Sequence, residues 1–266
     1  MARQIGHRKI SGTIDGLTNY IMKGKAFVRK KSNLDRERVL KDKAFEKSRI
    51  ALRQFTRAST CSKLIRRHLA HLMEHHPQKD MHNRLIKLIR PMIQKKEKDS
   101  QKKCALNTLP WNELEGFIFN DLANTNALPL NELKIDIKQP GQVKMYIPDW
   151  APIRKYAPDY AQRFRLTAAV ACLNFNKEKS DSDEAASDYL PLGIKKMDDI
   201  QLSLQIPDMK GCPVFLAVGI IYYLETNGKL LELKNSKYSQ CVIVKVLAGQ
   251  KTPKPRTKTK KKRTKG

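Results

Sequence analysis

The sequence has 266 residues, which is long enough for one or two domains. Its 53 Lys or Arg and 26 Asp or Glu give a formal net charge of +27. The longest apolar stretch, Val214–Leu224, is too short to span a bilayer, and no apolar stretch typical of a signal peptide follows the first residues. Five widely spaced cysteines without a C-x-x-C pair exclude a disulfide framework and a zinc ribbon, so we expect buried thiols in a cytoplasmic protein.

The positive charge is concentrated at the two ends of the chain. Residues 1–103 carry 28 basic and nine acidic side chains. Residues 104–250 carry 16 basic and 17 acidic side chains, and residues 251–266 carry nine basic and no acidic side chains. Charge that served only solubility would be spread over the whole surface. The partition therefore indicates that the two ends contact a polyanion.

The first predicted element is a basic β-hairpin. Its strands are expected at residues 18–22 and 26–29, on either side of Lys23-Gly24-Lys25. Gly24 can take the positive φ angle that tight hairpin turns need. A hairpin of this size is not stable alone, so we expect it to pack against another part of the protein.

Helices are expected after the hairpin, and together with it they make up the predicted region 1–103. Between about residues 44 and 59, an inward stripe is formed by Phe45, Ser48, Leu52, Phe55 and Ser59, widened by Ala51 and Ala58. A second helix is expected at residues 62–75, ended by Pro77, and a third after Asp80, kinked or divided at Pro91. The polar residues 95–103 are expected to form a linker.

Residues 104–250 are predicted to form an antiparallel, immunoglobulin-like β-sandwich, which makes the fold class α+β. Short β-rich segments separated by turn signals are expected at residues 116–119, 133–137, 143–147, 164–175, 201–206, 214–224, 229–233 and 241–247. Asn227-Gly228 is a strong hairpin signal between two of them. The acidic residues 177–188 are expected to form a surface loop, and the Lys-rich tail 251–266 to be disordered.

Several short motifs, in this order, resemble a family of uncharacterised bacterial hypothetical proteins. They are Gly12–Thr18, Tyr20, Gly24-Lys25, Arg29–Ser32, Lys41–Phe45, Gly116–Asn120, Val218–Ile220, Asn227-Gly228 and Leu233–Asn235. The resemblance spans nearly the whole chain apart from the basic tail. It implies a helical front end and a β-sandwich back end, but no activity, because that family has no established function.

No pattern in the sequence predicts catalysis, a cofactor or a metal site. His71-Leu72-Met73-Glu74-His75 fits H-x-x-E-H, which on a helix could hold Zn²⁺ with Glu74 as base. Pro77 follows immediately, cations surround the motif and no third ligand stands out, so a chance cluster on a basic helix is the better interpretation. The sequence contains no G-x-S-x-G, P-loop or G-x-G-x-x-G motif, and its paired acids fall in expected loops.

The sequence therefore predicts a non-enzymatic protein that binds the phosphate backbone of DNA or RNA, or another polyanion, with little sequence preference. Stacking aromatics are sparse, chiefly Tyr20 and Phe27, whereas arginine and lysine suit phosphate. The candidate contacts are Lys23, Lys25, Arg29, Lys30, Lys31, Arg36, Arg38, Arg49, Arg53, Arg57, Arg66, Arg67, Lys258, Lys260, Lys261, Lys262 and Arg263. The alternative is a structural or adaptor protein whose sandwich binds a protein partner.

Overall fold

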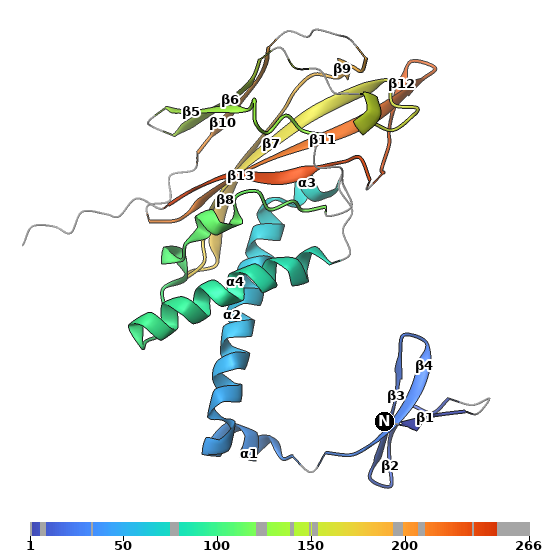
Figure 1. The fold of residues 1–266 in the computed structure, drawn as a ribbon, viewed down its shortest axis with the longest axis vertical. Coiled ribbons are helices and arrows are strands. Elements are labelled where there is room, and N and C mark those ends of the chain that lie inside the picture. The colour runs from blue at the N-terminus through green and yellow to red at the C-terminus, as the bar shows by residue number, and fades with distance from the viewer. Residues whose placement is uncertain are drawn as a thin grey trace, which may run out of the picture. The chain divides into compact units, whose positions relative to one another are not determined.

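The computed structural model describes residues 2–5, 9–32, 34–74, 80–120, 127–138, 141–148, 150, 154–193, 199–206, 211–235 and 237–248 (Figure 1). The tail expected to be disordered lies outside these residues. The contacts divide the chain into two compact units, residues 1–53 and residues 54–266. The boundary falls within helix α2 (Glu46–His68).

The first unit contains a four-stranded antiparallel sheet, called the N-terminal sheet below. Its strands are β1 (Ala2–Arg3), β2 (Gly12–Ile14), β3 (Leu17–Met22) and β4 (Lys25–Lys30), in the order β1-β4-β3-β2. Met22 pairs with Lys25, and both Lys23 and Gly24 have positive φ angles, so the β3–β4 connection is a two-residue type I′ turn. The predicted hairpin is thus present, with two further strands at its edges.

The helix that was expected to span residues 44–59 is longer and faces differently. After α1 (Arg36–Lys41) and the 3₁₀ helix η1 (Lys43–Phe45), α2 runs unbroken from the first predicted helix into the start of the second, because residues 46–68 contain neither Gly nor Pro. The predicted stripe is wrong for Ser48, Leu52 and Phe55, which are exposed. Burial begins at Gln54, where the second unit starts, and continues through Ala58, Cys61, Ser62, Leu64 and Ile65.

The later helices also differ from expectation. The short α3 (Ala70–Glu74) is followed by α4 (Met81–Ser100), which continues through Pro91 and through most of the expected linker. Pro91 is exposed, whereas Ile89, Met92 and Ile93 are buried, so burial of the apolar face offsets the hydrogen bond that proline removes. Pro77 lies outside the described residues.

Two long strands form the middle of a six-stranded antiparallel sheet, called the central sheet. These are β7 (Arg163–Asn174) and β11 (Val214–Thr226), which pair with each other from Arg163 to Cys172. The outer edge of β7 is shared by β8 (Lys179–Ala186) and β9 (Leu190–Pro191), and that of β11 by β12 (Lys229–Glu232) and β13 (Cys241–Leu247). Asn227 and Gly228, both with positive φ, form the expected hairpin turn between β11 and β12.

A three-stranded antiparallel sheet, called the outer sheet, packs against the central sheet. It contains β5 (Lys134–Lys138), β6 (Gln142–Ile147) and β10 (Ile200–Gln205) in the order β10-β6-β5. The buried side chains of β6 and β10 share one apolar cluster with Leu166, Val170 and Leu216 of the central sheet. The predicted α+β class with an antiparallel sandwich is confirmed.

Two predictions for this region are wrong. The acidic stretch expected to be a loop contains β8, which pairs with β7 over eight residues. Small side chains such as Ser180 and Ala185 allow that pairing, while Asp181 and Glu184 keep the strand polar at the sheet edge. Residues 116–119 form no strand, since only Ile118 makes an isolated bridge, to Val242.

The part of α2 after residue 53, together with α3 and α4, forms a third layer on the other face of the central sheet (Figure 1). Alternate residues of β7 separate the layers: Leu166, Ala168 and Val170 face the outer sheet, whereas Ala169 and Ala171 belong to the helix-side cluster. That cluster also contains Leu85 and Ile89 of α4 and Ile65 of α2. Helices after residue 54 therefore belong to the same unit as the sheets, whereas the change of periodicity in the sequence suggested a division near residue 103.

Candidate nucleic-acid interface

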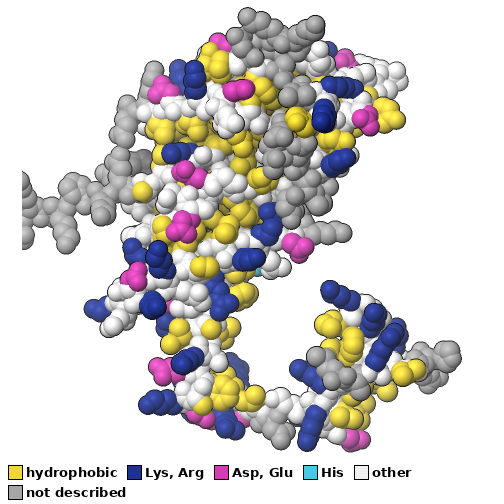
Figure 2. Space-filling model, in the orientation of Figure 1, with side chains coloured by type: hydrophobic (Ala, Val, Ile, Leu, Met, Phe, Trp, Pro, Cys, Tyr) yellow, Lys and Arg dark blue, Asp and Glu magenta, His cyan; other side chains and the backbone are white. Residues whose placement is uncertain are grey.

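The N-terminal sheet is strongly basic. Residues 1–32 contain eight Lys or Arg and a single acidic residue, Asp15. Figure 2 shows dark blue and yellow side chains over β3 and β4, with little magenta. Lys23, Lys25, Arg29, Lys30 and Lys31 are all exposed, so these five predicted contacts are accessible in the described structure.

The strand register assigns the side chains of this sheet to two faces. Residues that pair directly lie on the same face, and the face changes at each step along a strand. One face, called the aromatic face below, carries Tyr20 opposite Phe27, Thr18 opposite Arg29, Met22 opposite Lys25, and Arg3 beside Phe27. The other, called the aliphatic face, carries Ile14, Leu17, Asn19, Ile21, Ala26, Val28 and Lys30.

The aromatic face contains a row of flat side chains. The Tyr20 and Phe27 rings are stacked, with centroids 5.8 Å apart and planes inclined by 26°. The guanidinium carbon of Arg29 lies 5.7 Å from the centroid of the Tyr20 ring, a cation–π distance. Both rings are half-buried, and Arg29 and Lys25 are exposed beside them.

The predicted cations that follow the sheet have less uniform surroundings. Arg36 is exposed, whereas the Arg38 Nε atom donates to the Asp42 carboxylate at 3.4 Å, an exposed pair one helical turn apart. That bond and one from the backbone N–H of Ala44 keep the pKa of Asp42 below its usual value, with the backbone bond contributing most. Arg38 is therefore partly neutralised, while Arg36 stays available to a phosphate.

The three arginines spaced four residues apart on α2 do not form one phosphate-binding face. Arg49 donates to the backbone oxygens of Val39 at 2.8 Å and of Asp42 at 2.7 Å, so it holds the start of α2 against α1 and η1. Arg53 is exposed. Arg57 is enclosed, with its side chain only 11% exposed.

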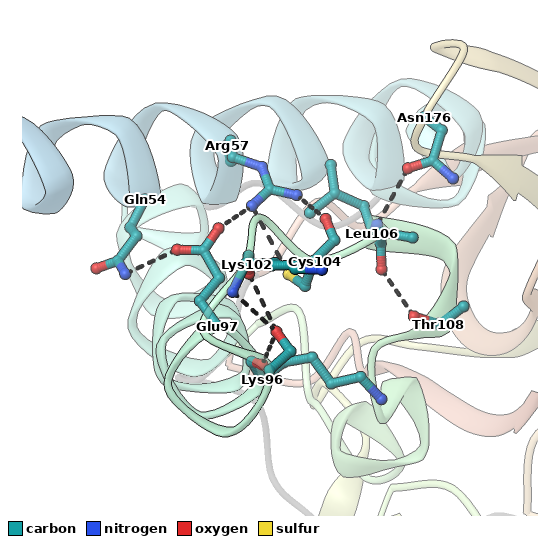
Figure 3. A network of polar contacts seen from close by, with 11 residues as sticks. Gln54, Arg57, Lys96, Glu97, Lys102, Cys104, Leu106, Thr108 and Asn176 are labelled. Carbon is teal, nitrogen blue, oxygen red and sulfur yellow. Dashed lines mark hydrogen bonds and ion pairs between the residues drawn. The ribbon is translucent and has the colours of Figure 1, made fainter.

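Arg57 belongs to a buried polar network that connects α2 with α4 (Figure 3). Its guanidinium pairs with Glu97, whose side chain is 7% exposed, and donates to the backbone oxygen of Cys104. Gln54 Nε2 donates to the second oxygen of Glu97 at 2.9 Å. This arrangement corrects the sequence-based assignment: Arg57 neutralises a buried carboxylate and presents no surface to a phosphate.

The remaining predicted cations lie near the end of α2 or outside the described residues. Arg67 is exposed, and Arg66 is half-buried, with an Nε atom that has no hydrogen-bond partner among the described atoms. The five tail residues Lys258, Lys260, Lys261, Lys262 and Arg263 lie outside the described residues. Within those residues, five of the nine exposed cations proposed as contacts lie in the N-terminal sheet or directly after it.

The histidines of the H-x-x-E-H region point to separate partners. His68 Nε2 is hydrogen-bonded to Ser180 Oγ, His82 Nδ1 lies 3.0 Å from Ser62 Oγ, and His71 Nε2 lies 3.7 Å from a Glu184 carboxylate oxygen. Burial, reinforced by a neighbouring arginine, lowers the pKa of both His68 and His82. Among the described residues, no three His, Cys, Asp or Glu gather as metal ligands would; His75 and His76 are outside that set.

A pocket that the sequence did not indicate lies on the helix-side face of the central sheet, beside α3. Its volume is about 570 Å³, and its polar lining includes His71, Arg165, Glu184, Tyr189, Tyr223 and Glu232. The Arg165 guanidinium lies 5.0 Å from the Tyr189 ring centroid, and Arg165 Nε donates to the backbone oxygen of Ser187 at 2.7 Å. Burial raises the pKa of Tyr223 to about 12.

This pocket does not extend the basic surface. Two carboxylates, Glu184 and Glu232, stand against the single guanidinium of Arg165, which disfavours a phosphate. Its lining comes from α3, β7, β8, β11, β12 and the β8–β9 connection, which are drawn from separate parts of the sequence, so no local motif could reveal it.

No protein-family model matches the chain, and a search of curated proteins finds no match either. The resemblance to bacterial hypothetical proteins thus stays a prediction. In the described part of the chain, no helix has both the length and the apolar composition needed to cross a membrane.

Proposed function

We propose that this protein is a non-enzymatic, nucleic-acid-associated protein of the bacterial cytoplasm, and that its basic N-terminal sheet and Lys-rich tail bind the phosphate backbone. The observation that carries the proposal is the set of exposed cations in the β3–β4 turn, on β4 and at Lys31 directly after it. Residues 1–32, which contain them, have a single acidic residue. Phosphate contacts of this kind supply affinity without reading sequence.

The proposal is tested by the salt dependence of binding. Each phosphate that a cation neutralises contributes about −0.9 to the slope of log K against log [salt] on duplex DNA. We expect Lys23→Gln, Lys25→Gln and Lys31→Gln together to reduce the magnitude of that slope by about 2–3. Deletion of residues 251–266 should reduce it further.

The matched control removes three exposed lysines from the second unit, as Lys63→Gln, Lys87→Gln and Lys98→Gln on α2 and α4. It makes the same change of net charge, and we expect it to leave the slope nearly unchanged. An equal reduction of the salt slope in both triple variants would show that only the net charge of the protein matters, and that the lysines of the N-terminal sheet make no specific phosphate contacts. Absence of binding by the full chain in 50 mM salt would overturn the proposal.

A second candidate function is that of an adaptor whose sandwich binds a protein partner. The pocket beside α3 favours it, because Tyr189 and Tyr223 meet edge to face at 5.0 Å beside groups of both charges, a lining suited to a peptide side chain. Binding of nucleic acid by the full chain that is unaffected by every change in the N-terminal sheet would favour this candidate.

A further inference from the structure

The two aromatic residues of the N-terminal sheet lie on its two central strands. The order β1-β4-β3-β2 places Phe27 on β4 and Tyr20 on β3, and the register pairs them directly. Short strands flank them on both sides, so the rings lie at the middle of one face. Tyr20 is the only tyrosine, and Phe27 one of two phenylalanines, in residues 1–53.

The surroundings of this pair suit a polyanion with aromatic bases. Arg29 lies over Tyr20, and Lys25 and Arg3 share the face, each exposed. Among the described residues of the sheet, the other side chains on this face are Thr13, Thr18 and Met22, and none is acidic. The face therefore combines π surfaces at its centre with cations around them.

We propose that the aromatic face binds single-stranded nucleic acid, with bases stacked on Tyr20 and Phe27 and the backbone held by Arg29, Lys25 and Arg3. This inference rests on the proposed nucleic-acid-binding function and names its ligand class. Aromatic side chains at the middle of a small antiparallel sheet stack unpaired bases of any sequence, because every base has a π face. In a duplex those faces are already stacked on neighbouring base pairs, so only the phosphates could be contacted.

Phosphate contact and base stacking have different experimental signatures. Loss of a cation reduces the salt slope, by about 0.7 per phosphate contact on a single strand. Loss of a stacking ring lowers affinity at every salt concentration and leaves the slope unchanged, because no counterion is released by stacking. The two contributions can therefore be separated in the same titration.

The test compares the affinity of the full chain for labelled dT12, rU12 and a 12-base-pair duplex by fluorescence anisotropy. We expect both single strands to bind more tightly than the duplex at equal salt. Tyr20→Leu and Phe27→Leu should each weaken single-strand binding at least fivefold, with an unchanged salt slope and unchanged duplex affinity. Tyr20→Phe, which keeps the ring, should bind within about twofold of the wild type.

The matched control is Ile21→Ala, one residue from Tyr20 on the aliphatic face and 53% exposed. We expect it to bind single strands as the wild type does. A second measurement uses the unaltered protein: photocrosslinking of a 5-bromouracil-containing strand should attach it to Tyr20 or Phe27, whatever the leucine variants do to folding.

The outcomes separate the two proposals. Failure of every oligonucleotide to bind at 50 mM salt would overturn the proposed function together with this inference. Equal affinity for single strand and duplex, with crosslinks elsewhere in the chain, would overturn the inference and leave phosphate binding standing.

Discussion

The N-terminal sheet and the central sheet are both antiparallel and both use two-residue type I′ turns, yet they differ in what covers them. The central sheet is covered on one face by helices and on the other by the outer sheet, and β11 is buried from Val214 to Tyr223. In the N-terminal sheet only Ala26 is buried among the residues whose burial is described. A sheet with two covered faces stabilises a fold, whereas one with exposed faces has surface for a ligand.

The largest expected effects are on the stability of the second unit. Phe215 is fully buried and meets Trp111 edge to face at 5.7 Å. Phe215→Ala should lower the free energy of unfolding by about 3–5 kcal/mol, since it leaves a cavity between sheet and helices. Both tryptophans, Trp111 and Trp150, lie in the second unit, so tryptophan fluorescence in urea measures this change.

A large-to-small substitution in the N-terminal sheet should have a much smaller effect on stability than Phe215→Ala has in the central sheet. Ile21→Ala should change the protection of β3 amides against hydrogen exchange by less than about 0.5 kcal/mol, because half of the side chain is already exposed. A loss comparable to that of Phe215→Ala would show that the aliphatic face is covered in solution.

The second prediction concerns the buried pair that α2 and α4 share. Arg57→Ala leaves the Glu97 carboxylate buried without its counterion, so we expect a loss of about 3–5 kcal/mol in the same urea experiment. Lys63→Ala, an exposed change on the same helix, should cost less than about 0.5 kcal/mol.

The double variant Arg57→Met with Glu97→Met tests the mechanism. It removes both charges and should restore most of the lost stability. It should also leave the salt slope of nucleic-acid binding unchanged. A reduced slope would show that Arg57 contacts phosphate despite its burial.

The third prediction compares equivalent turns in the two units. Gly24 and Gly228 have φ angles of +74° and +71°, and a Cβ atom added at either would meet nothing within 4 Å. Alanine at either position should therefore cost about 1–2 kcal/mol of conformational strain alone. Gly228→Ala should shift the urea transition of the second unit, whereas Gly24→Ala should increase exchange of β3 and β4 amides without that shift.

The smallest expected effect is a pH dependence confined to the second unit. The pKa of His68 is lowered in the folded state, mainly by burial, so the neutral imidazole is the form that folding favours. The associated stability is present above the unfolded-state pKa of about 6.5 and is lost as pH falls through the folded-state value. Urea midpoints should therefore decrease from pH 7.5 to pH 5.5, and less so in His68→Asn.

Local patterns in the sequence were enough for most strands and for the turns. The hairpin around Gly24 and the turn at Asn227-Gly228 were predicted because positive φ angles demand particular residues. β8 was not predicted, because a run of acidic residues is typical of a solvated loop. These residues form a strand only by pairing with β7, and their own sequence does not indicate that partner. Helix α4 was expected to be kinked or divided at Pro91. It is not divided, because the neighbouring residues are buried along its apolar face.

The candidate site was also predictable from the sequence only in part. Its cations and its two aromatic residues could be named from the sequence, because charge and residue type are local properties. The sequence did not indicate that Tyr20 stacks on Phe27 with Arg29 over the Tyr20 ring, since that follows from strand register. It also assigned Arg57 to the surface, because helical spacing relates residues on one helix and says nothing of Glu97 on another.

The sequence by itself therefore determined the charge partition, the α+β class and the tight turns, all of which depend on composition and on backbone preferences within a few residues. Tertiary structure alone decided which faces of those elements are covered. The three-layer packing buries both faces of β7 and β11, because apolar area is removed from water only where separate segments meet. The contact of α2 with α4 encloses Arg57 in the same way. The same physics leaves the N-terminal sheet exposed, because within the first unit no apolar layer covers its described faces.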